Sequence, residues 1–149
     1  MKKSCGFLIQ CQGKFLLCHA TKPSGNINLD DGQWGIPKGG VEDGESEIET
    51  ALRETYEETS LSLKESDINK TPICTYSTKT KKYIIFYCHI NDPEIFKTKL
   101  KCITMIDDTD SPENDAFVWV EWDKAREIAI KNQKFNLFTK DVKEKILSM

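Results

Sequence analysis

Residues 39–61 read GGVEDGESEIETALRETYEETSL, and acidic residues are concentrated in this stretch. It holds eight of the 24 acidic residues of the chain and a single base, Arg53. Ser46 and Glu49 fit a capping box, which predicts a helix that begins here and ends near Thr59. Apolar or small side chains recur at the helical period and are expected to pack on the core: Ile48, Ala51, Leu52, Thr55 and Thr59.

Three glutamates of this helix, Glu54, Glu57 and Glu58, stand at positions i, i+3 and i+4 and share one face, expected to point away from the apolar stripe. Like charges at these spacings each cost about 0.2–0.5 kcal/mol, and only Arg53 is close enough along the helix to offset part of that cost. Two interpretations stay open. The face is a solvated acidic surface, or it is a site for a hard cation such as Mg²⁺ or Mn²⁺.

The pattern around these glutamates resembles the Nudix box, G-x5-E-x7-R-E-U-x-E-E-x-G-U, in which U is a bulky apolar residue. Gly39, Glu45, Arg53 and the three glutamates occupy the matching positions. Two positions differ: Thr55 stands for an aliphatic residue and Ser60 for a glycine. Glycine is the residue that most easily turns left-handed at a helix end, so the path of the chain after the helix is left open.

The rest of the chain alternates between strand-like and helical patterns. With 149 residues, 38% of them hydrophobic and 30% charged, the composition predicts one globular domain over residues 1–149. Strands mixed with three helices predict a mixed sheet packed between helices, and the resemblance implies a Nudix α/β/α sandwich. The pattern predicts strands at 5–11, 14–20, 72–77, 83–90 and 117–121, and a short apolar segment at 34–37. It predicts helices from a cap at 46 to about 59, at 122–130 and at 137–147. Polar loops are predicted at 21–33 and 105–115.

Nudix enzymes hydrolyse a pyrophosphate bond in a nucleoside diphosphate linked to another group, with Mg²⁺ or sometimes Mn²⁺. The resemblance implies that Arg53 orients the glutamates and that Glu45 fixes the loop of the box or binds metal through water. Glu54 is also a candidate base that orients the attacking water. Cations would offset the charge of the pyrophosphate and acidify a bound water. The implied ligands come from the box: the Gly39 carbonyl, Glu54, Glu57 and Glu58.

Further candidate residues lie outside the box. Glu113, in the late acidic loop, is a candidate extra metal ligand or base, with an exposed loop acid as the alternative. Lys38 is a candidate phosphate contact or a surface lysine. Tyr76 is a candidate for stacking on a base, an interaction worth about 1–3 kcal/mol, or else a core or rim tyrosine. His19 and His89 are expected to be core or edge histidines with satisfied hydrogen bonds.

The resemblance implies adenine nucleotides, such as diadenosine polyphosphates or ADP-ribose, as substrates. Alternatives are removal of pyrophosphate from RNA 5′ ends and a sanitising nucleoside triphosphate pyrophosphatase. A Nudix module that binds a nucleotide without cleaving it is disfavoured because all three box glutamates are present. Whether the chain forms a homodimer is left open.

The net charge of −3 gives no sign of a partner such as nucleic acid or an anionic membrane. No apolar run reaches the length of a transmembrane helix, and the N-terminal pattern does not fit a signal peptide. The six cysteines form no C-x-x-C pair and are expected to be free thiols in a reducing cytoplasm.

Overall fold

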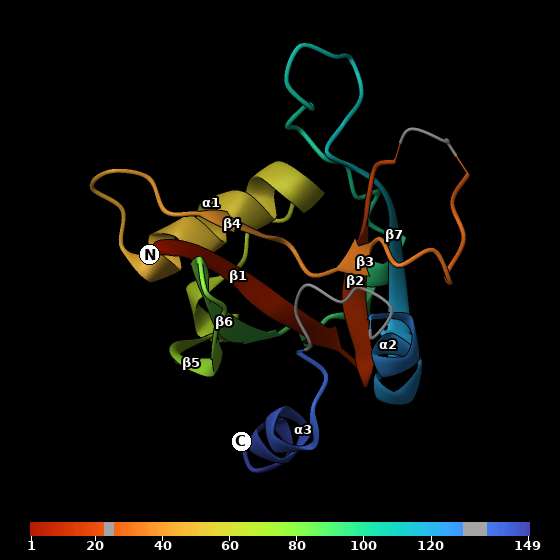
Figure 1. The fold of residues 1–149 in the computed structure, drawn as a ribbon. Helices are drawn as coiled ribbons and strands as arrows, with labels where there is room; N and C mark the ends of the chain where they lie inside the picture. The colour runs from red at the N-terminus through yellow and green to blue at the C-terminus, as the bar shows by residue number, and fades with distance from the viewer. Residues whose placement is uncertain (23–25, 130–136) are drawn as a thin grey trace.

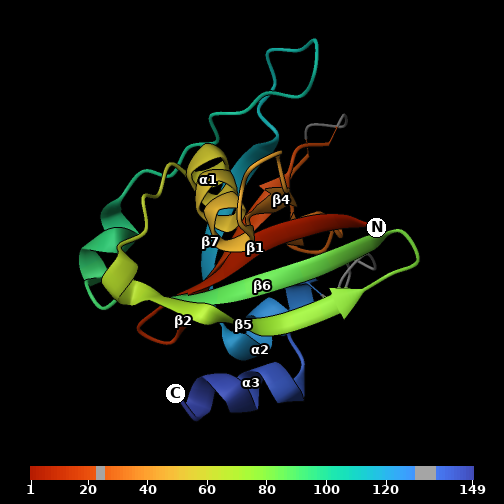
Figure 2. The same cartoon turned by 90° about the vertical axis from the view of Figure 1, so that its left-hand side faces the viewer.

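The computed structural model describes residues 1–22, 26–129 and 137–149. Its described part is a mixed sheet of seven strands with helices on both faces. Helix α1 (Glu47–Thr59) covers one face, and α2 (Trp122–Ala129) and α3 (Lys140–Leu147) lie on the other (Figures 1 and 2). This arrangement confirms the predicted α/β/α sandwich.

The two central strands, β1 (Lys2–Cys11) and β6 (Lys81–His89), pair in parallel, and the other described pairs are antiparallel. The strand order is β3-β2-β1-β6-β5, with β4 beside β1 and β7 beside β2. The remaining strands are β2 (Lys14–Ala20), β3 (Trp34–Gly35), β4 (Lys38–Gly40), β5 (Ile68–Ser77) and β7 (Asn114–Glu121), and two 3-10 helices cover Glu65–Asp67 and Pro93–Lys97.

The core is divided between the two faces of the sheet. Phe7 and Ile9 of β1 pack with Ala51 of α1, whereas Leu8 packs with Ile128 of α2 on the other face. Successive strand residues point to opposite faces, so a strand covered by helices on both sides is apolar throughout. This explains why Phe7, Leu8 and Ile9 of β1 are apolar at three consecutive positions.

Helix α1 begins as predicted. The Ser46 hydroxyl accepts a hydrogen bond from the Glu49 N–H, and the Glu49 carboxylate accepts one from the Ser46 N–H. At the other end, Ser60 adopts the left-handed conformation with φ 71° although it is not glycine. Its hydroxyl donates to the Lys101 carbonyl at 2.6 Å, which helps to hold this conformation.

Several boundaries differ from the prediction. Strand β7 begins at Asn114 rather than 117, because its first residues are polar and do not show the apolar alternation. Strand β5 begins at Ile68 rather than 72, and its pairing with β6 is irregular between Asn69 and Cys74. Helix α3 begins at Lys140 after the Thr139 N-cap, later than predicted. The predicted last residue of the 122–130 helix lies outside the described residues.

All six cysteines are free, as predicted. Cys18 and Cys88 are buried, and burial raises the pKa of the Cys88 thiol to about 12. In residues 1–22, 26–129 and 137–149, no helix combines the length and the apolar character that crossing a membrane requires.

Candidate active site on the acidic helix

Arg53 is the centre of an ion-pair network on α1. Its Nε donates to Glu45 at 2.7 Å, and its Nη1 donates to Glu54 and Glu57, each at 3.0 Å. Its Nη2 donates to the Gly40 carbonyl at 3.0 Å, which ties the helix to β4. The hydrogen bond to Glu45, together with the two glutamates of the helix, raises the pKa of Arg53. One guanidinium therefore orients three carboxylates.

Glu45 connects the loop before the helix to this network. Its carboxylate accepts hydrogen bonds from the Glu42 N–H at 3.0 Å and the Thr50 hydroxyl at 2.9 Å, as well as from Arg53. The Arg53 hydrogen bond is the main reason that the pKa of Glu45 falls to about 2. These contacts suit a residue that shapes the loop.

Glu58 is buried, with 8% of its surface exposed, so the three glutamates do not form the outward face expected from helical spacing. It neighbours the buried Thr55 and Thr59 on the helix and turns toward the sheet. Its Oε2 accepts from the Lys38 N–H at 3.1 Å, and its Oε1 accepts from Asn114 Nδ2 at 3.0 Å. Burial raises the pKa of Glu58 to about 8.

Glu54 and Gly39 complete the inner part of the site. The carboxyl groups of Glu54 and Glu58 contact each other, and burial raises the pKa of Glu54 as well. A Cβ atom at Gly39 would lie 2.1 Å from Cδ of Glu54, so the β4 backbone lies directly against this carboxyl group. Any side chain at position 39 would therefore displace the Glu54 carboxyl group from its present position.

The donor set fits a divalent cation. The buried carboxyl group of Glu58 and the half-buried one of Glu54 both have raised pKa values and contact each other, and hard oxygen donors are those that Mg²⁺ and Mn²⁺ prefer. Within the described residues, no three His, Cys, Asp or Glu side chains are already gathered as a metal-binding group. Arg53 holds Glu54 and Glu57, whereas the Lys38 N–H and the Asn114 side chain hold Glu58.

Glu113 is exposed immediately before β7, and its carboxylate accepts a hydrogen bond from the Thr104 hydroxyl at 3.1 Å. It is adjacent in the chain to Asn114, which reaches Glu58. Asn114 was missed by sequence reasoning because it falls in the predicted polar loop. Its only sequence signal is its position immediately before an apolar strand.

Tyr76 lies on β5, away from the glutamates. Tyr76 pairs with Tyr83 of β6, Tyr83 pairs with Ser4 of β1, and Ser4 pairs with Gly40 of β4. At the usual spacing between neighbouring strands, these three steps place the Tyr76 backbone about 14 Å from the Gly40 backbone. This row faces away from α1, because the neighbouring Cys5 and Ile84 pack on the α1 side. The Tyr76 side chain is 44% exposed.

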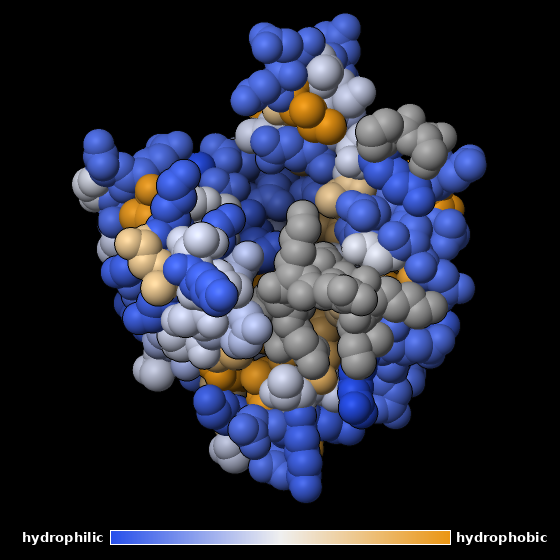
Figure 3. Space-filling model, in the orientation of Figure 1, coloured by the Kyte–Doolittle hydropathy of each residue, from blue (hydrophilic) through white to orange (hydrophobic). Residues whose placement is uncertain are grey.

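The surface around the site is mostly hydrophilic. In Figure 3 a hydrophilic hollow lies between the α1 side and the β2, β3 and β7 side, below the projecting loop that precedes β7.

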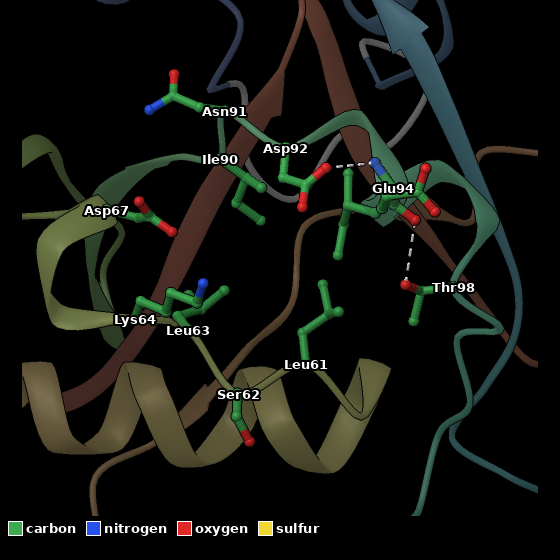
Figure 4. Close-up of a pocket in the computed structure, with 11 residues that line it drawn as sticks. Leu61, Ser62, Leu63, Lys64, Asp67, Ile90, Asn91, Asp92, Glu94 and Thr98 are labelled. Atoms are coloured by element: carbon green, nitrogen blue, oxygen red, sulfur yellow. Dashed lines mark hydrogen bonds between the residues drawn. The ribbon is translucent and has the colours of Figure 1, made fainter.

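A separate pocket of about 350 Å³ lies beyond the C-terminal end of α1 (Figure 4). Apolar side chains, including Leu61 and Ile90, line it together with Lys64, Asp67 and Asp92. The box glutamates do not line this pocket.

Comparison with known proteins gives matches along most of the chain. The family described as NUDIX domain matches residues 3–141. The nucleoside triphosphatase NudI of Salmonella agona (strain SL483) is 33% identical over 123 residues, which cover 83% of this chain and 82% of that protein. A nucleoside triphosphate pyrophosphatase/Nudix hydrolase fusion protein of Bifidobacterium longum (strain NCC 2705) is 49% identical over 41 residues, covering 28% of this chain and 8% of that protein.

Solved structures share the fold. A binary complex of the C. elegans Ap4A hydrolase has a TM-score of 0.66 and 22% identity, with 100% of both chains covered. A mutT/nudix family protein from Listeria innocua has a TM-score of 0.64 and 21% identity, covering 99% of this chain and 94% of that chain.

Proposed function

Because the chain belongs to the Nudix hydrolase family, whose members are hydrolases of acid anhydrides, we propose that residues 1–149 form one domain that cleaves a pyrophosphate bond in nucleotides with Mg²⁺ or Mn²⁺. The observation that carries this proposal is the carboxylate cluster of α1. Arg53 orients Glu54 and Glu57, and Glu58 is buried against Glu54, where the Lys38 N–H and the Asn114 side chain hold its carboxyl group. The six free thiols support a reducing compartment such as the cytoplasm.

The proposed role of each residue follows from its contacts. A bound cation would offset the charge of the pyrophosphate and lower the pKa of a bound water. Glu57 and Glu58 are the principal proposed ligands, with Glu54 and the Gly39 carbonyl beside them. Arg53 keeps two of the carboxylates in place.

Two carboxylates are candidates for the general base. Glu54 is next to both other glutamates, and burial raises its pKa above the ordinary value, which makes its carboxylate a better proton acceptor. Glu113 is the alternative, because the adjacent Asn114 places this part of the chain at Glu58. Lys38 is a proposed phosphate contact, since its backbone already lies at Glu58.

Two substrate classes are favoured by different observations. The similarity to NudI over four-fifths of the chain supports nucleoside triphosphates. Diadenosine polyphosphates and ADP-ribose form the second class; the exposed ring of Tyr76 is their proposed stacking surface, and because it lies on β5 away from the glutamates, these substrates would have to extend from the acidic helix to that strand.

A panel assay tests the proposal and separates these classes. Nucleoside triphosphates, diadenosine tri- and tetraphosphate, ADP-ribose and triphosphorylated RNA are incubated with the protein and Mg²⁺. Glu57→Gln should lower kcat on the best substrate by about 100-fold or more, because it alters a metal ligand. Glu47→Gln is the matched control on the same helix, where Glu47 pairs with Lys3 at the surface, and should retain activity.

Two results would contradict the proposal. If the wild-type protein hydrolyses no member of the panel, a binding module is favoured. If Glu57→Gln turns over as fast as the wild type, the carboxylate cluster is not the catalytic site.

A further inference from the structure

His19, near the end of β2, has a fully buried ring with a carboxylate at each nitrogen. Its Nε2 lies 2.6 Å from Oδ2 of Asp31, and its Nδ1 is hydrogen-bonded to Oδ1 of Asp115. The Trp34 ring packs edge-on against the imidazole with 4.9 Å between ring centroids. A neutral imidazole donates through one nitrogen and an imidazolium through both, so at least one carboxylate accepts a hydrogen bond from the ring in either form.

Asp115 occupies a bulge in β7. The pairing of β2 with β7 runs from His19 opposite Ala116 to Ala20 opposite Asn114, and the register shifts between these pairs. Asp115 is therefore an extra residue on β7, and both it and Ala116 stand opposite His19. Bulges of this kind redirect side chains and are common beside active sites.

The bulge decides which way Asn114 points. Phe117 packs in the cluster on the α1 side of the sheet, and Ala116 packs in the cluster on the opposite side. Strict alternation from these residues would turn Asn114 away from α1, because a shift of one residue moves a side chain to the other face. With the extra residue, Asn114 faces α1 and donates to Glu58 at 3.0 Å.

We propose that Asp115, held by His19, is a positioning residue for the active site. Their contact fixes the bulge, and the bulge holds Asn114 against Glu58. The role in turnover rests on the proposed function, whereas the structural link does not. Thr21, two residues after His19, supports the same segment: its N–H donates to the Glu113 carbonyl at 3.0 Å and its hydroxyl to the Pro112 carbonyl at 2.6 Å.

The side-chain amide signal of Asn114 in ¹⁵N-labelled protein tests the link without any substrate. The signal is assigned by its loss in Asn114→Ala. Asp115→Ala should move it toward the position of a solvent-exposed asparagine and speed its hydrogen exchange. Asp31→Asn is the matched control, because Asp31 touches the same imidazole from outside β7, and it should leave the signal in place.

An unmoved Asn114 signal in folded Asp115→Ala would overturn the proposal. An equal displacement in Asp31→Asn would also overturn it, since any loss of charge beside His19 would then be enough. If Asp115→Ala does not fold, Asp115→Ser, whose shorter side chain is chosen to lose the contact with the His19 ring, is measured in the same way, and an unmoved Asn114 signal in that variant overturns the proposal.

Steady-state kinetics test the catalytic consequence. Asp115→Ala should lower kcat by about 10-fold, as losses of outer-shell contacts do, with little change in KM. An unchanged kcat with a displaced Asn114 signal would overturn the positioning role. If the wild type hydrolyses nothing in the panel, the proposed function fails, and the NMR result alone decides whether Asp115 positions Asn114.

Discussion

Replacing Glu58 with glutamine should remove the pH dependence of stability that this buried carboxyl group imposes on the metal-free protein. Its pKa is raised to about 8 by burial, from an ordinary value of 4.5. A carboxyl group with a raised pKa in the folded state stabilises the fold fully below pH 4.5. That contribution is lost as the pH rises through 8.

The size of the effect follows from this shift. Each unit of pKa difference corresponds to about 1.4 kcal/mol, so the loss across the interval amounts to roughly 4–5 kcal/mol of unfolding free energy. This is a large part of the stability of a typical domain, which is about 5–15 kcal/mol. Glutamine cannot ionise, so Glu58→Gln should gain stability relative to the wild type by about this amount between pH 4.5 and pH 9.

Urea unfolding in EDTA at several pH values measures the difference between the two proteins. Glu45→Gln is the control from the same network, because the pKa of Glu45 is lowered to about 2. A lowered pKa adds stability above pH 4.5 and loses it only as the pH falls through 2, so this variant should differ from the wild type by a constant amount from pH 5 to pH 9. Mg²⁺ should stabilise the wild type at pH 8 and have little effect on Glu58→Gln. A pH-independent difference between Glu58→Gln and the wild type would refute the reasoning.

Two further predictions concern residues outside the metal cluster. Ser60→Ala loses the hydrogen bond to Lys101 and should cost about 1 kcal/mol in urea unfolding, whereas Ser60→Gly also relieves the left-handed strain of about 1 kcal/mol and should unfold like the wild type. Equal stability of the two variants would show that the backbone is not strained. Tyr76→Ala should raise KM for dinucleoside polyphosphates by about 10-fold if the ring stacks on a base, and an unchanged KM would return Tyr76 to a structural role.

The helix and its network could be predicted because their determinants are close in the sequence. The capping box of Ser46 and Glu49 spans one helical turn, and Arg53 reaches Glu57 at i+4. Such spacings fix geometry once the segment is helical, without knowledge of the rest of the fold.

The burial of Glu58 could not be predicted in this way. Its partner Asn114 is 56 positions away, and the contact between His19 and Asp115 spans 96 positions. Helical spacing states which glutamates share a face, but the sheet packed against that face decides which carboxyl group is enclosed. The bulge in β7 adds a shift of register that no periodicity in the sequence displays.

The acidic residues of the box have opposite electrostatic environments although they belong to one short segment. Glu45 accepts hydrogen bonds from Arg53, the Glu42 N–H and the Thr50 hydroxyl, and its pKa falls to about 2. Glu58 is buried beside another carboxyl group, and its pKa rises to about 8. An acid such as Glu45 stays ionised and stabilises the local structure, whereas the ionised form of an acid such as Glu58 is stabilised most by a bound cation. The donors around each carboxylate therefore separate the structural acid from the proposed ligand.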